Sequence, residues 1–436
     1  MPKAPTVFVV KGGTVVDASG TRRADVMFEA GVITAVEENL DAKTVIDASG
    51  CIVAPGFVDL HTHLREPGRE EAEDIETGTR AAALGGYTAV VAMPNTEPAI
   101  DNAELVRDIK ATAIGKSCEV YPAGAITVGR KGEQLSPMAE MARAGVTLFT
   151  DDGAGVQDAA LMRRALEYAK GLSSASGGGR RVTLAQHCED NALAAGGSMH
   201  EGAWSSRLGI PGQPSSAETA MVLRDIELVR LTGAPMHFLH MSTAESLRAI
   251  AQAKAAGLPI TAEVAPHHFT LTDACCCDYD ATFKVNPPLR TEADVEAVKQ
   301  ALRDGIVDAI ATDHAPHAPE LKELPFDQAP PGMLGLETAL AVALDELELP
   351  LEVVLGYLSW RPAKVAGLLG EHGNAVAKGS VANLCIIDPN YEWVVEGRAL
   401  ASKSRNTPYE GRKLKGKVRH TICRGIPTVL DGASQR

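Results

Sequence analysis

Apolar residues follow two different spacings along the chain, and the spacing changes near residue 55. Residues 6–53 carry short runs rich in β-branched residues, separated by turns such as Lys11-Gly12-Gly13. Runs of this kind predict a small antiparallel sheet. From Phe57 onward, an apolar run of four to seven residues is followed by a polar break and a helical stretch, and this order repeats. The repeat predicts β/α units around a parallel sheet that is buried on both faces.

Eight apolar runs separated by helical stretches predict an α/β fold, a (β/α)8 barrel of the TIM type. The expected strands are Phe57–Leu60, Ala89–Met93, Glu119–Ala125, Val146–Phe149, Val182–Ala185, Met236–Leu239, Ile260–Val264 and Val307–Ile310. The expected helices are Glu71–Ala83, Asn102–Ile114, Ala159–Tyr168, Ala217–Leu231, Glu245–Ala255, Glu292–Leu302 and a longer helical stretch, Leu336–Leu369.

After this helical stretch the chain returns to strand-like runs, at Asn383–Ile387, Trp393–Val395 and Lys417–Cys423. We expect these runs to rejoin the N-terminal sheet, so that both chain ends form one small β-sandwich domain. The N-terminal strands of that domain are Thr6–Val10, Asp25–Phe28, Val32–Val36 and Thr44–Ile46. The predicted domains are 1–54 and 371–436 for the sandwich and 55–370 for the barrel, with a disordered tail from Gly432.

Composition excludes several classes of protein. A chain of 436 residues, 45% of them hydrophobic, is long enough for one large barrel and a smaller unit. The formal net charge of -14 argues against a surface that binds nucleic acid or an anionic membrane. No secretory signal and no run of ~18 apolar residues is present, so we expect a soluble cytoplasmic protein. The eight cysteines, three of them adjacent at 275–277, do not resemble a disulfide framework.

Two histidines at the end of the first barrel strand have the spacing of metal ligands. Residues two apart in a strand point the same way, so His61 and His63 present both imidazoles to one side. Imidazole suits zinc better than nickel, copper or iron in such a place. On its own a His-x-His pair is equally well an ordinary polar strand end, and the rest of the chain has to supply the context.

Four more strands end in possible ligands. The C-terminal ends of barrel strands form the active-site face, and these strands are followed by Asp151-Asp152, His187, His240 and Asp313. A single buried histidine is usually a hydrogen-bonded core residue, but repetition at one face argues against that interpretation. Four histidines and two carboxylates exceed one tetrahedral zinc, so two metals with a bridging ligand, about 3.5–4 Å apart, fit better.

This arrangement predicts hydrolytic chemistry. Two metals acidify a bridging water to hydroxide and polarise a carbonyl group for its attack. Asp313 can take the proton of the attacking hydroxide and give it to a leaving nitrogen, as general acid and base.

Further polar residues beside the strand ends indicate a substrate site. Arg65 lies two residues beyond His63, on the same side of an extended chain, where its guanidinium fits a carboxylate through paired hydrogen bonds. A surface ion pair is the alternative for Arg65. Asn95, Asn286 and His317 lie at strand ends or in proline-containing turns, where each could equally stabilise the turn.

Six segments together resemble the bacterial type I dihydroorotases of the amidohydrolase superfamily, and the resemblance runs from about Lys11 to Gly425. The segments are His61-Thr62-His63-Leu64-Arg65-Glu66-Pro67-Gly68, Met93-Pro94-Asn95-Thr96, Phe149-Thr150-Asp151-Asp152-Gly153, His187-Cys188-Glu189-Asp190, Asn286-Pro287-Pro288-Leu289-Arg290 and Ala311-Thr312-Asp313-His314-Ala315-Pro316-His317. The resemblance implies a zinc-dependent cyclic amide hydrolase that reversibly cyclises N-carbamoyl-L-aspartate to (S)-dihydroorotate in pyrimidine biosynthesis.

The resemblance also implies a role for each residue. One zinc is bound by His61, His63 and Asp313, the other by His187 and His240, and Asp152 bridges them. The substrate carboxylate is held by His63, Arg65, Asn95 and His317, and the pyrimidine-like ring by Asn286, Pro331 and Gly332. It further implies a homo-oligomer and a possible association with aspartate carbamoyltransferase.

The bridging position departs from the common superfamily pattern. Many superfamily members bridge their metals with a carboxylated lysine, whereas this chain has Thr150-Asp151-Asp152. The family pattern favours Asp152, but spacing alone does not choose between the two aspartates. An aspartate bridge is shorter than a carbamate, so one tightly bound zinc with a weak second is an open alternative. We interpret His267 and His268 as helix-entry or outer-sphere groups rather than as ligands.

Two other functions are consistent with parts of the sequence. Related cyclic-amide hydrolases of hydantoins, dihydropyrimidines or allantoin use a lysine bridge and need no arginine after His-x-His, so Arg65 and Asp152 favour dihydroorotase. A catalytically silent barrel that supports aspartate carbamoyltransferase would have lost metal ligands, and this chain retains them all.

Overall fold

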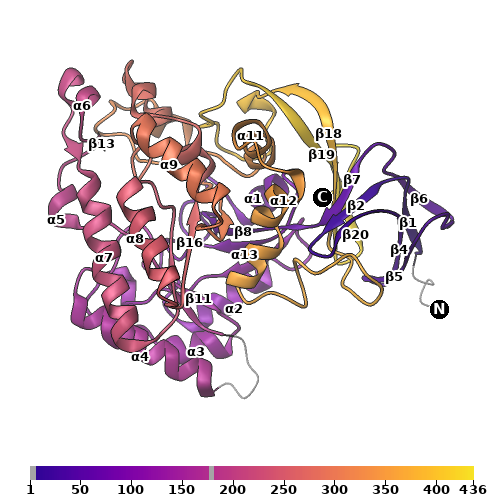
Figure 1. Ribbon diagram of the computed structural model, residues 1–436, viewed down its shortest axis with the longest axis horizontal. Helices are drawn as coiled ribbons and strands as arrows, with labels where there is room; N and C mark the ends of the chain where they lie inside the picture. Colours follow the sequence, from indigo (N-terminus) through magenta and orange to yellow (C-terminus); the bar gives the residue numbers. More distant parts are fainter. Residues whose placement is uncertain (1–5, 176–180) are drawn as a thin grey trace.

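Eight parallel strands form the centre of the computed structural model, which describes residues 6–175 and 181–436 (Figure 1). They make two sheets, ordered β8-β9-β10 and β11-β12-β15-β16-β17. Isolated parallel bridges join the two sheets at both edges, from Gly124 to Phe149 and from Thr62 to His314. The strands are β8 (Phe57–Thr62), β9 (Tyr87–Ala92), β10 (Glu119–Pro122), β11 (Leu148–Phe149), β12 (Thr183–Gln186), β15 (Met236–Phe238), β16 (Ile260–Val264) and β17 (Ala309–Ile310). Each overlaps one of the eight predicted strands.

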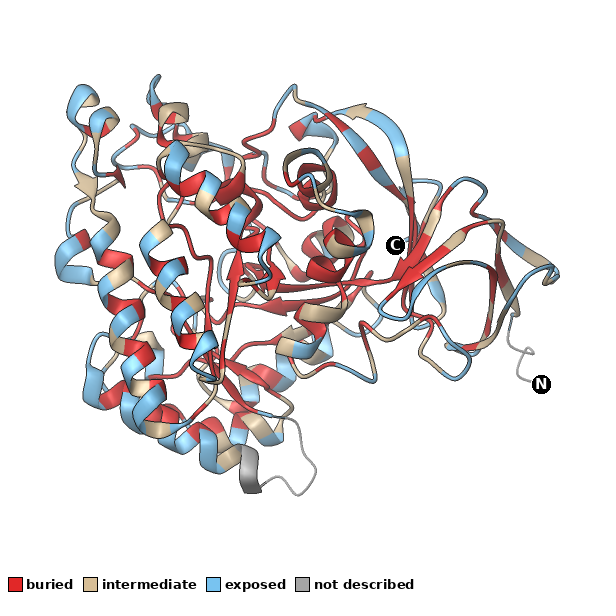
Figure 2. Cartoon of the chain, in the orientation of Figure 1, coloured by how far each residue is buried: buried red, intermediate tan, exposed pale blue. Residues whose placement is uncertain are grey.

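Helices alternate with these strands and turn their polar faces outward, whereas the strands are buried (Figure 2). Each predicted helix overlaps an observed one, and the long helical stretch divides into three. The helices are α1 (Ile75–Leu84), α2 (Ala103–Thr112), α4 (Ala159–Ala175), α7 (Ser215–Thr232), α8 (Ala244–Ala255), α9 (Glu292–Arg303), α11 (Ala339–Glu346), α12 (Leu351–Leu358) and α13 (Trp360–Val365). Between Phe57 and Val365, the α-helices and strands that were not predicted are short: α3 (Met138–Arg143), α5 (Asn191–Ala194), α6 (Ala203–Leu208), α10 (Pro319–Lys322), β13 (Met199–His200) and β14 (Gly212–Gln213).

Helix-capping residues fix where several helices begin. The Asp74 carboxylate accepts the backbone N–H of Thr77 at 2.8 Å at the start of α1. The Thr243 hydroxyl accepts the backbone N–H of Ser246 at 3.3 Å at the start of α8. Such caps satisfy N–H groups that have no partner within the helix. The N-cap of helix α8 therefore lies three residues after His240, and the chain leaves the strand end in a defined direction.

Strands from both chain ends form two further sheets, seen at the right of Figure 1. One has seven strands, ordered β21-β20-β19-β18-β7-β2-β3, and the other has four, ordered β5-β4-β1-β6. Buried apolar residues from both sheets form one core cluster, with Val10 and Phe28 from one sheet and Val15 and Ile386 from the other. The strands are β1 (Phe8–Lys11), β2 (Thr14–Asp17), β3 (Gly20–Arg23), β4 (Asp25–Glu29), β5 (Val32–Glu37), β6 (Thr44–Asp47), β7 (Ile52–Pro55), β18 (Leu384–Val394), β19 (Lys413–Cys423), β20 (Ile426–Leu430) and β21 (Ala433–Ser434).

Three details of these sheets differ from the prediction. The N-terminal sheet is mixed rather than antiparallel, because β6 crosses to the far edge and pairs in parallel with β1. The C-terminal strands join the other sheet, where β18 pairs with β7. The tail is ordered: Ala433 pairs with Leu430, because the backbone of β20 offers hydrogen-bonding groups at its edge.

Membrane crossing and disulfide bonding were also expected to be absent. Among the described residues, no helix combines the length and apolar character of a bilayer span. The eight cysteines are free thiols, and five of them are buried away from the 275–277 triplet.

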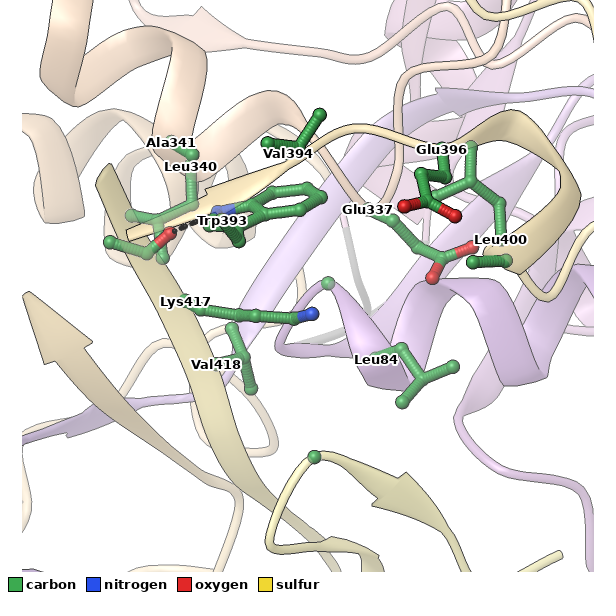
Figure 3. Close-up of a pocket in the computed structure, with 14 residues that line it drawn as sticks. Leu84, Glu337, Leu340, Ala341, Trp393, Val394, Glu396, Leu400, Lys417 and Val418 are labelled. Atoms are coloured by element: carbon green, nitrogen blue, oxygen red, sulfur yellow. Dashed lines mark hydrogen bonds between the residues drawn. The ribbon is translucent and has the colours of Figure 1, made fainter. Parts of the chain in front are cut away.

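A cavity of about 300 Å³ lies where the start of α11 meets β18 and β19 (Figure 3). The Glu337 carboxylate in this cavity accepts the backbone N–H of Ala401 at 2.8 Å. The ammonium group of Lys417 lies 4.7 Å from the centre of the Trp393 ring. Burial raises the pKa of Glu337 to about 7, because the charged carboxylate is separated from water.

We expect Glu337→Gln to remove part of the pH dependence of stability. The unfolded chain loses the Glu337 proton near pH 4.5, but the folded chain loses it near pH 7, so stability falls as pH rises through this window. Glutamine stays neutral. Between about pH 5 and about pH 8, we expect the native chain to lose about 1–2 kcal/mol relative to the variant. Urea unfolding at both pH values measures this difference. Glu396→Gln, at an exposed position lining the same cavity, is the matched control and should leave the pH dependence unchanged.

Candidate metal centre and substrate cavity

The strand ends bring the predicted metal ligands into one buried cluster. His61 Nε2 lies 3.4 Å from Asp152 Oδ1 and 3.4 Å from Asp313 Oδ1. His63 Nε2 lies 3.1 Å from Asp313 Oδ1. Within the described residues, two groups have ligand atoms close enough to hold a metal ion, and all of their members are buried. They are His61, His63 and Asp313, and His61, Asp152 and His240.

His187 lies beside the second group rather than within it. Its Nδ1 is 2.9 Å from His240 Nε2 and 3.6 Å from Asp152 Oδ1. The prediction assigns His187 and His240 to one metal. The compact group contains His61 in place of His187, and His187 lies near the same carboxylate oxygen.

The two adjacent aspartates have different surroundings. Asp151 accepts the backbone N–H groups of Ile126 at 2.8 Å and Thr127 at 3.0 Å, and it also accepts the Thr127 hydroxyl. Its carboxylate is therefore used in holding the loop after β10. Asp152 turns toward the histidines, and its Oδ1 lies 3.6 Å from His240 Nε2.

The Asp152 carboxylate is strongly stabilised in its charged form. Burial alone would raise its pKa, but the charge of His61 and a hydrogen bond from His187 outweigh burial. The pKa of Asp152 therefore lies well below its usual range. Burial is also outweighed at Asp313, where the charge of His61 and the hydrogen bond from His63 lower the pKa. Both aspartates thus present anionic oxygens to the centre.

A buried carboxylate behind His61 tests whether this site fits a metal. His61 Nδ1 lies 3.0 Å from Glu263 Oε1, and His237 Nε2 lies 3.0 Å from Glu263 Oε2. Since the charged carboxylate only accepts, His61 donates from Nδ1. Its Nε2 atom is buried without a hydrogen-bond partner and faces two further carboxylates. Burial would lower the pKa of His61, but the charges of Asp152 and Asp313 outweigh burial and raise it, so positive charge is favoured at this point. A metal ion on Nε2 in place of the proton would supply that charge, and the residues therefore fit a metal ion.

Asp59 joins the first strand to the segment that carries Asp313. One oxygen of its carboxylate accepts the backbone N–H of Thr312 at 2.7 Å, and the other accepts the Thr312 hydroxyl at 2.7 Å and the hydroxyl of Thr62. Burial raises the pKa of Asp59 to about 7. This contact fixes Asp313 relative to His61. His61 lies in the first of the eight central strands along the chain, and Asp313 follows the last.

A cavity of about 220 Å³ is lined by most of the cluster. Every predicted site residue except His61 lines this cavity. The predicted residues that line it are His63, Arg65, Asn95, Asp152, His187, His240, Asn286, Asp313, His317, Pro331 and Gly332.

Arg65 and His317 form one wall of the cavity. Arg65 is buried and donates from Nε to the carbonyl oxygen of Pro316 at 3.0 Å. His317 donates from Nε2 to the carbonyl oxygen of Pro331 at 2.8 Å. Burial and the charge of Arg65 lower the pKa of His317 to about 2, so this imidazole is neutral. The wall thus offers one guanidinium cation to an anionic ligand.

The two asparagines contact metal-ligand candidates as well as the cavity. Asn95 Oδ1 accepts from His63 Nδ1 at 2.9 Å, and its amide nitrogen lies 3.4 Å from Asp152 Oδ2. Asn286 Nδ2 lies 3.3 Å from His187 Nε2. Each asparagine can therefore orient a histidine while it faces the cavity.

Several residues around the site were not predicted. Glu263 and His237 lie within strands, where a polar residue in an apolar run was the available signal. Arg69 lines the cavity as a second cation and has no distinguishing sequence signal. His268, interpreted from the sequence as an outer group, donates from Nε2 to the Pro287 carbonyl at 3.0 Å and so supports the loop of Asn286.

The sequence and the fold both have clear relatives. The sequence model of the Dihydro-orotase-like family matches residues 50–246. A dihydroorotase of Pelotomaculum thermopropionicum is 48% identical over 432 residues, which cover 97% of this chain and 98% of that protein. A dihydroorotase of Mycobacterium tuberculosis is 46% identical over 426 residues, covering 94% of this chain and 96% of that protein.

Solved structures of hydantoinases share the fold. A D-hydantoinase structure, 26% identical, has a TM-score of 0.84 and covers 98% of this chain and 96% of its own. An L-hydantoinase from Arthrobacter aurescens, 24% identical with a TM-score of 0.87 and covering 98% of this chain and 97% of its own, supports the fold alone. Similar over nearly its full length to several dihydroorotases, with a buried cluster of candidate metal ligands and the fold of the amidohydrolases, the chain belongs to the dihydroorotase family.

Proposed function

We propose that this chain is a zinc-dependent dihydroorotase, which interconverts (S)-dihydroorotate plus water with N-carbamoyl-L-aspartate in pyrimidine biosynthesis. The observation that carries the proposal is a buried guanidinium, Arg65, in the same 220 Å³ cavity as the cluster of metal-ligand residues. Metal ligands suit amide hydrolysis, and the arginine suits a substrate that also has a carboxylate.

We assign two zinc ions to the cluster. His61, His63 and Asp313 would hold one, His187 and His240 the other, and Asp152 would bridge them. Asp152 is favoured over Asp151 because the Asp151 carboxylate is already used by Ile126 and Thr127. When bound, the metals lower the pKa of water and polarise the amide carbonyl.

The cavity walls orient the substrate. Arg65, Asn95, His317 and His63 would hold the substrate carboxylate, with Arg65 supplying the charge. Asn286 and the backbone of Pro331 and Gly332, which adjoins His317, would hold the pyrimidine-like ring. Fixing both ends of a small ligand places its ring amide above the cluster and reduces the entropy cost of reaction.

Asp313 is suited to move the proton. In hydrolysis, an Asp313 carboxylate oxygen takes a proton from the attacking water and delivers it to the ring nitrogen as the ring C–N bond breaks. Cyclisation follows the same steps in reverse, and the carboxylate returns to its starting state in either direction. The buried contact of Asp59 with Thr312 would keep Asp313 in place during this transfer.

Larger features of the chain are part of the proposal. We infer that the two parallel sheets close into one (β/α)8 barrel, since isolated bridges join both pairs of edges. We also infer a barrel domain over residues 55–370 and a β-sandwich domain from residues 1–54 and 371–436, because the two end sheets share a core cluster. A homo-oligomer, association with aspartate carbamoyltransferase and a cytoplasmic location stay predictions.

The second candidate function is hydrolysis of hydantoins or dihydropyrimidines, which the fold shared with hydantoinase structures favours. The two functions differ in whether the substrate carries a carboxylate. Arg65 would have no such partner on a hydantoin or on dihydrouracil.

The test combines metal content with turnover of dihydroorotate and of dihydrouracil, which has the same ring without the carboxylate. We expect about two zinc ions per chain and turnover of dihydroorotate. In Arg65→Met, we expect kcat/KM for dihydroorotate to fall by about 100-fold, because a charged paired hydrogen bond is lost. Any slow turnover of dihydrouracil should be unchanged. Faster native turnover of dihydrouracil than of dihydroorotate would instead support the second candidate.

A further inference from the structure

Lys322, at the end of α10, contacts three backbone carbonyl groups from two separate segments. Its Nζ donates to Ala281 O at 2.8 Å, to Lys284 O at 3.2 Å and to Pro330 O at 2.9 Å. An ammonium group has three N–H donors, so all three are used. In the described part of the chain, no carboxylate lies within 4.0 Å of this ammonium. Its charge is therefore directed at the two segments and not at an ion-pair partner.

Both segments form walls of the substrate cavity. Val285 and Asn286 follow the first pair of carbonyls, and the run 330–332 contains the third. The segments also touch directly, because the backbone N–H of Gly332 donates to Lys284 O at 2.9 Å. Gly332 has a φ of +150°, and a Cβ there would lie 2.7 Å from the carbonyl oxygen of Ala315. This close approach requires glycine, so the wall has little room to adjust.

We propose that Lys322 is a positioning residue, which holds segments 281–286 and 330–332 at a fixed separation and so sets the width of the substrate cavity. This inference rests on the proposed function, since that function assigns Asn286 and the backbone of residues 331 and 332 to the substrate ring. Three charge-assisted hydrogen bonds to carbonyl oxygens are stronger than bonds from a neutral donor. Lys322 does not line the cavity itself, so its effect on substrate passes through the two segments.

The charge on Lys322 is sensitive to pH near neutrality. Burial lowers the pKa of Lys322 to about 7, and the neighbouring cations Lys284 and Arg65 act in the same direction, against the opposing charge of Asp280. A neutral amine has two N–H donors and a lone pair, which leaves one of the three carbonyls without a donor. Above about pH 7, the contact between the segments should therefore loosen and substrate affinity should fall.

Kinetics of Lys322→Met and Lys322→Arg test the proposal. We expect Lys322→Met to raise KM for dihydroorotate about 10-fold or more, with kcat within about 3-fold of native and bound zinc unchanged. Arginine keeps a charge and has five N–H donors, so Lys322→Arg should recover part of the loss. The native KM should rise above about pH 7, and this rise should be smaller in Lys322→Met. Lys254→Met removes a lysine that donates to the carbonyl of Ile306 away from the cavity, and its KM should equal the native value.

An equal KM in Lys322→Met and the native chain would overturn the proposal. Loss of zinc in parallel with the rise in KM would do the same, because it would place the effect at the metal site. Hydrogen–deuterium exchange without substrate gives a separate answer: Lys322→Met should increase exchange in segment 281–286 and at Gly332, whose N–H bonds to Lys284, but not in β8. Pro330 and Pro331 have no backbone N–H to exchange. Unchanged exchange overturns the role of Lys322 whatever the activity. If the native chain does not turn over dihydroorotate, the proposed function fails and exchange alone decides the role of Lys322.

Discussion

Asp152→Asn should lose at least one of the two zinc ions that we propose and lower kcat for dihydroorotate by about 1,000-fold or more. The Asp152 carboxylate faces three histidine nitrogens within 3.4–3.6 Å, and the site is buried. An asparagine has nearly the same shape but no charge, so it cannot offset two metal charges in a site shielded from water. Zinc measured by mass spectrometry, together with initial rates at saturating dihydroorotate, gives both values.

Asp151→Asn is the matched control for this result. At this position the amide nitrogen would face the backbone N–H groups of Ile126 and Thr127 or leave one of them without an acceptor. We expect a loss of about 1–3 kcal/mol in the free energy of unfolding. Bound zinc should stay at the native level when the variant is measured well below its melting temperature. The opposite pattern, with zinc lost only in Asp151→Asn, would assign the bridge to Asp151.

Asp313→Asn should lower kcat by about 1,000-fold, with a much smaller change in KM. An asparagine amide cannot accept the proton of water and return it to the ring nitrogen, so the chemical step loses its acid and base. Arg65, Asn286 and His317 still line the cavity in this variant, and we expect them to preserve most of the substrate affinity. Initial rates in both reaction directions, with zinc content measured on the same samples, separate lost proton transfer from lost metal.

Asp308→Asn provides a control on the same strand. Asp308 lies at the opposite end of β17, where it accepts the backbone N–H of Ala262 at 2.8 Å and pairs with Lys254. We expect a loss of stability but native kcat and KM. The assignment of Asp313 would be contradicted if Asp313→Asn kept kcat within about 10-fold of native while its zinc content stayed full.

Much of the fold and of the candidate cluster could be predicted because both depend on local sequence. Buried parallel strands are short apolar runs, and β16 coincides in full with the predicted Ile260–Val264. Ligand-type residues directly after such runs must lie at one edge, because parallel strands end on the same side. The prediction therefore brought His61 and His240 together without any knowledge of the intervening chain. It also expected Arg65 to face the same site along an extended chain; Arg65 does line the cavity, but β8 ends at Thr62 and Arg65 has a φ of +61°, so a turn and not strand geometry brings it there.

The rest depended on contacts that local sequence does not encode. Asp151 and Asp152 are adjacent and chemically identical, and only the position of the β10 loop distinguishes them. Glu263 contacts His61 across a separation of 202 residues, so neither residue indicates its partner. Lys322 donates to backbone carbonyl groups. Every residue has such a group, so the sequence does not indicate which residues Lys322 contacts. The crossing of β6 to the far sheet edge likewise follows from tertiary packing and not from its own residues.

The contact of Asp59 with Thr312 has a consequence for how the protein is made. His61 and His63 leave the ribosome early, but Asp313 follows them by about 250 residues, and the edges of β8 and of the segment after β17 meet only then. Closing so long a loop carries an entropy cost that local pairing cannot offset beforehand. A nascent chain that ends before residue 313 thus contains all four histidines of the cluster but cannot complete the centre. Metal insertion is therefore expected late in synthesis, on chains whose first and last central strands have already met.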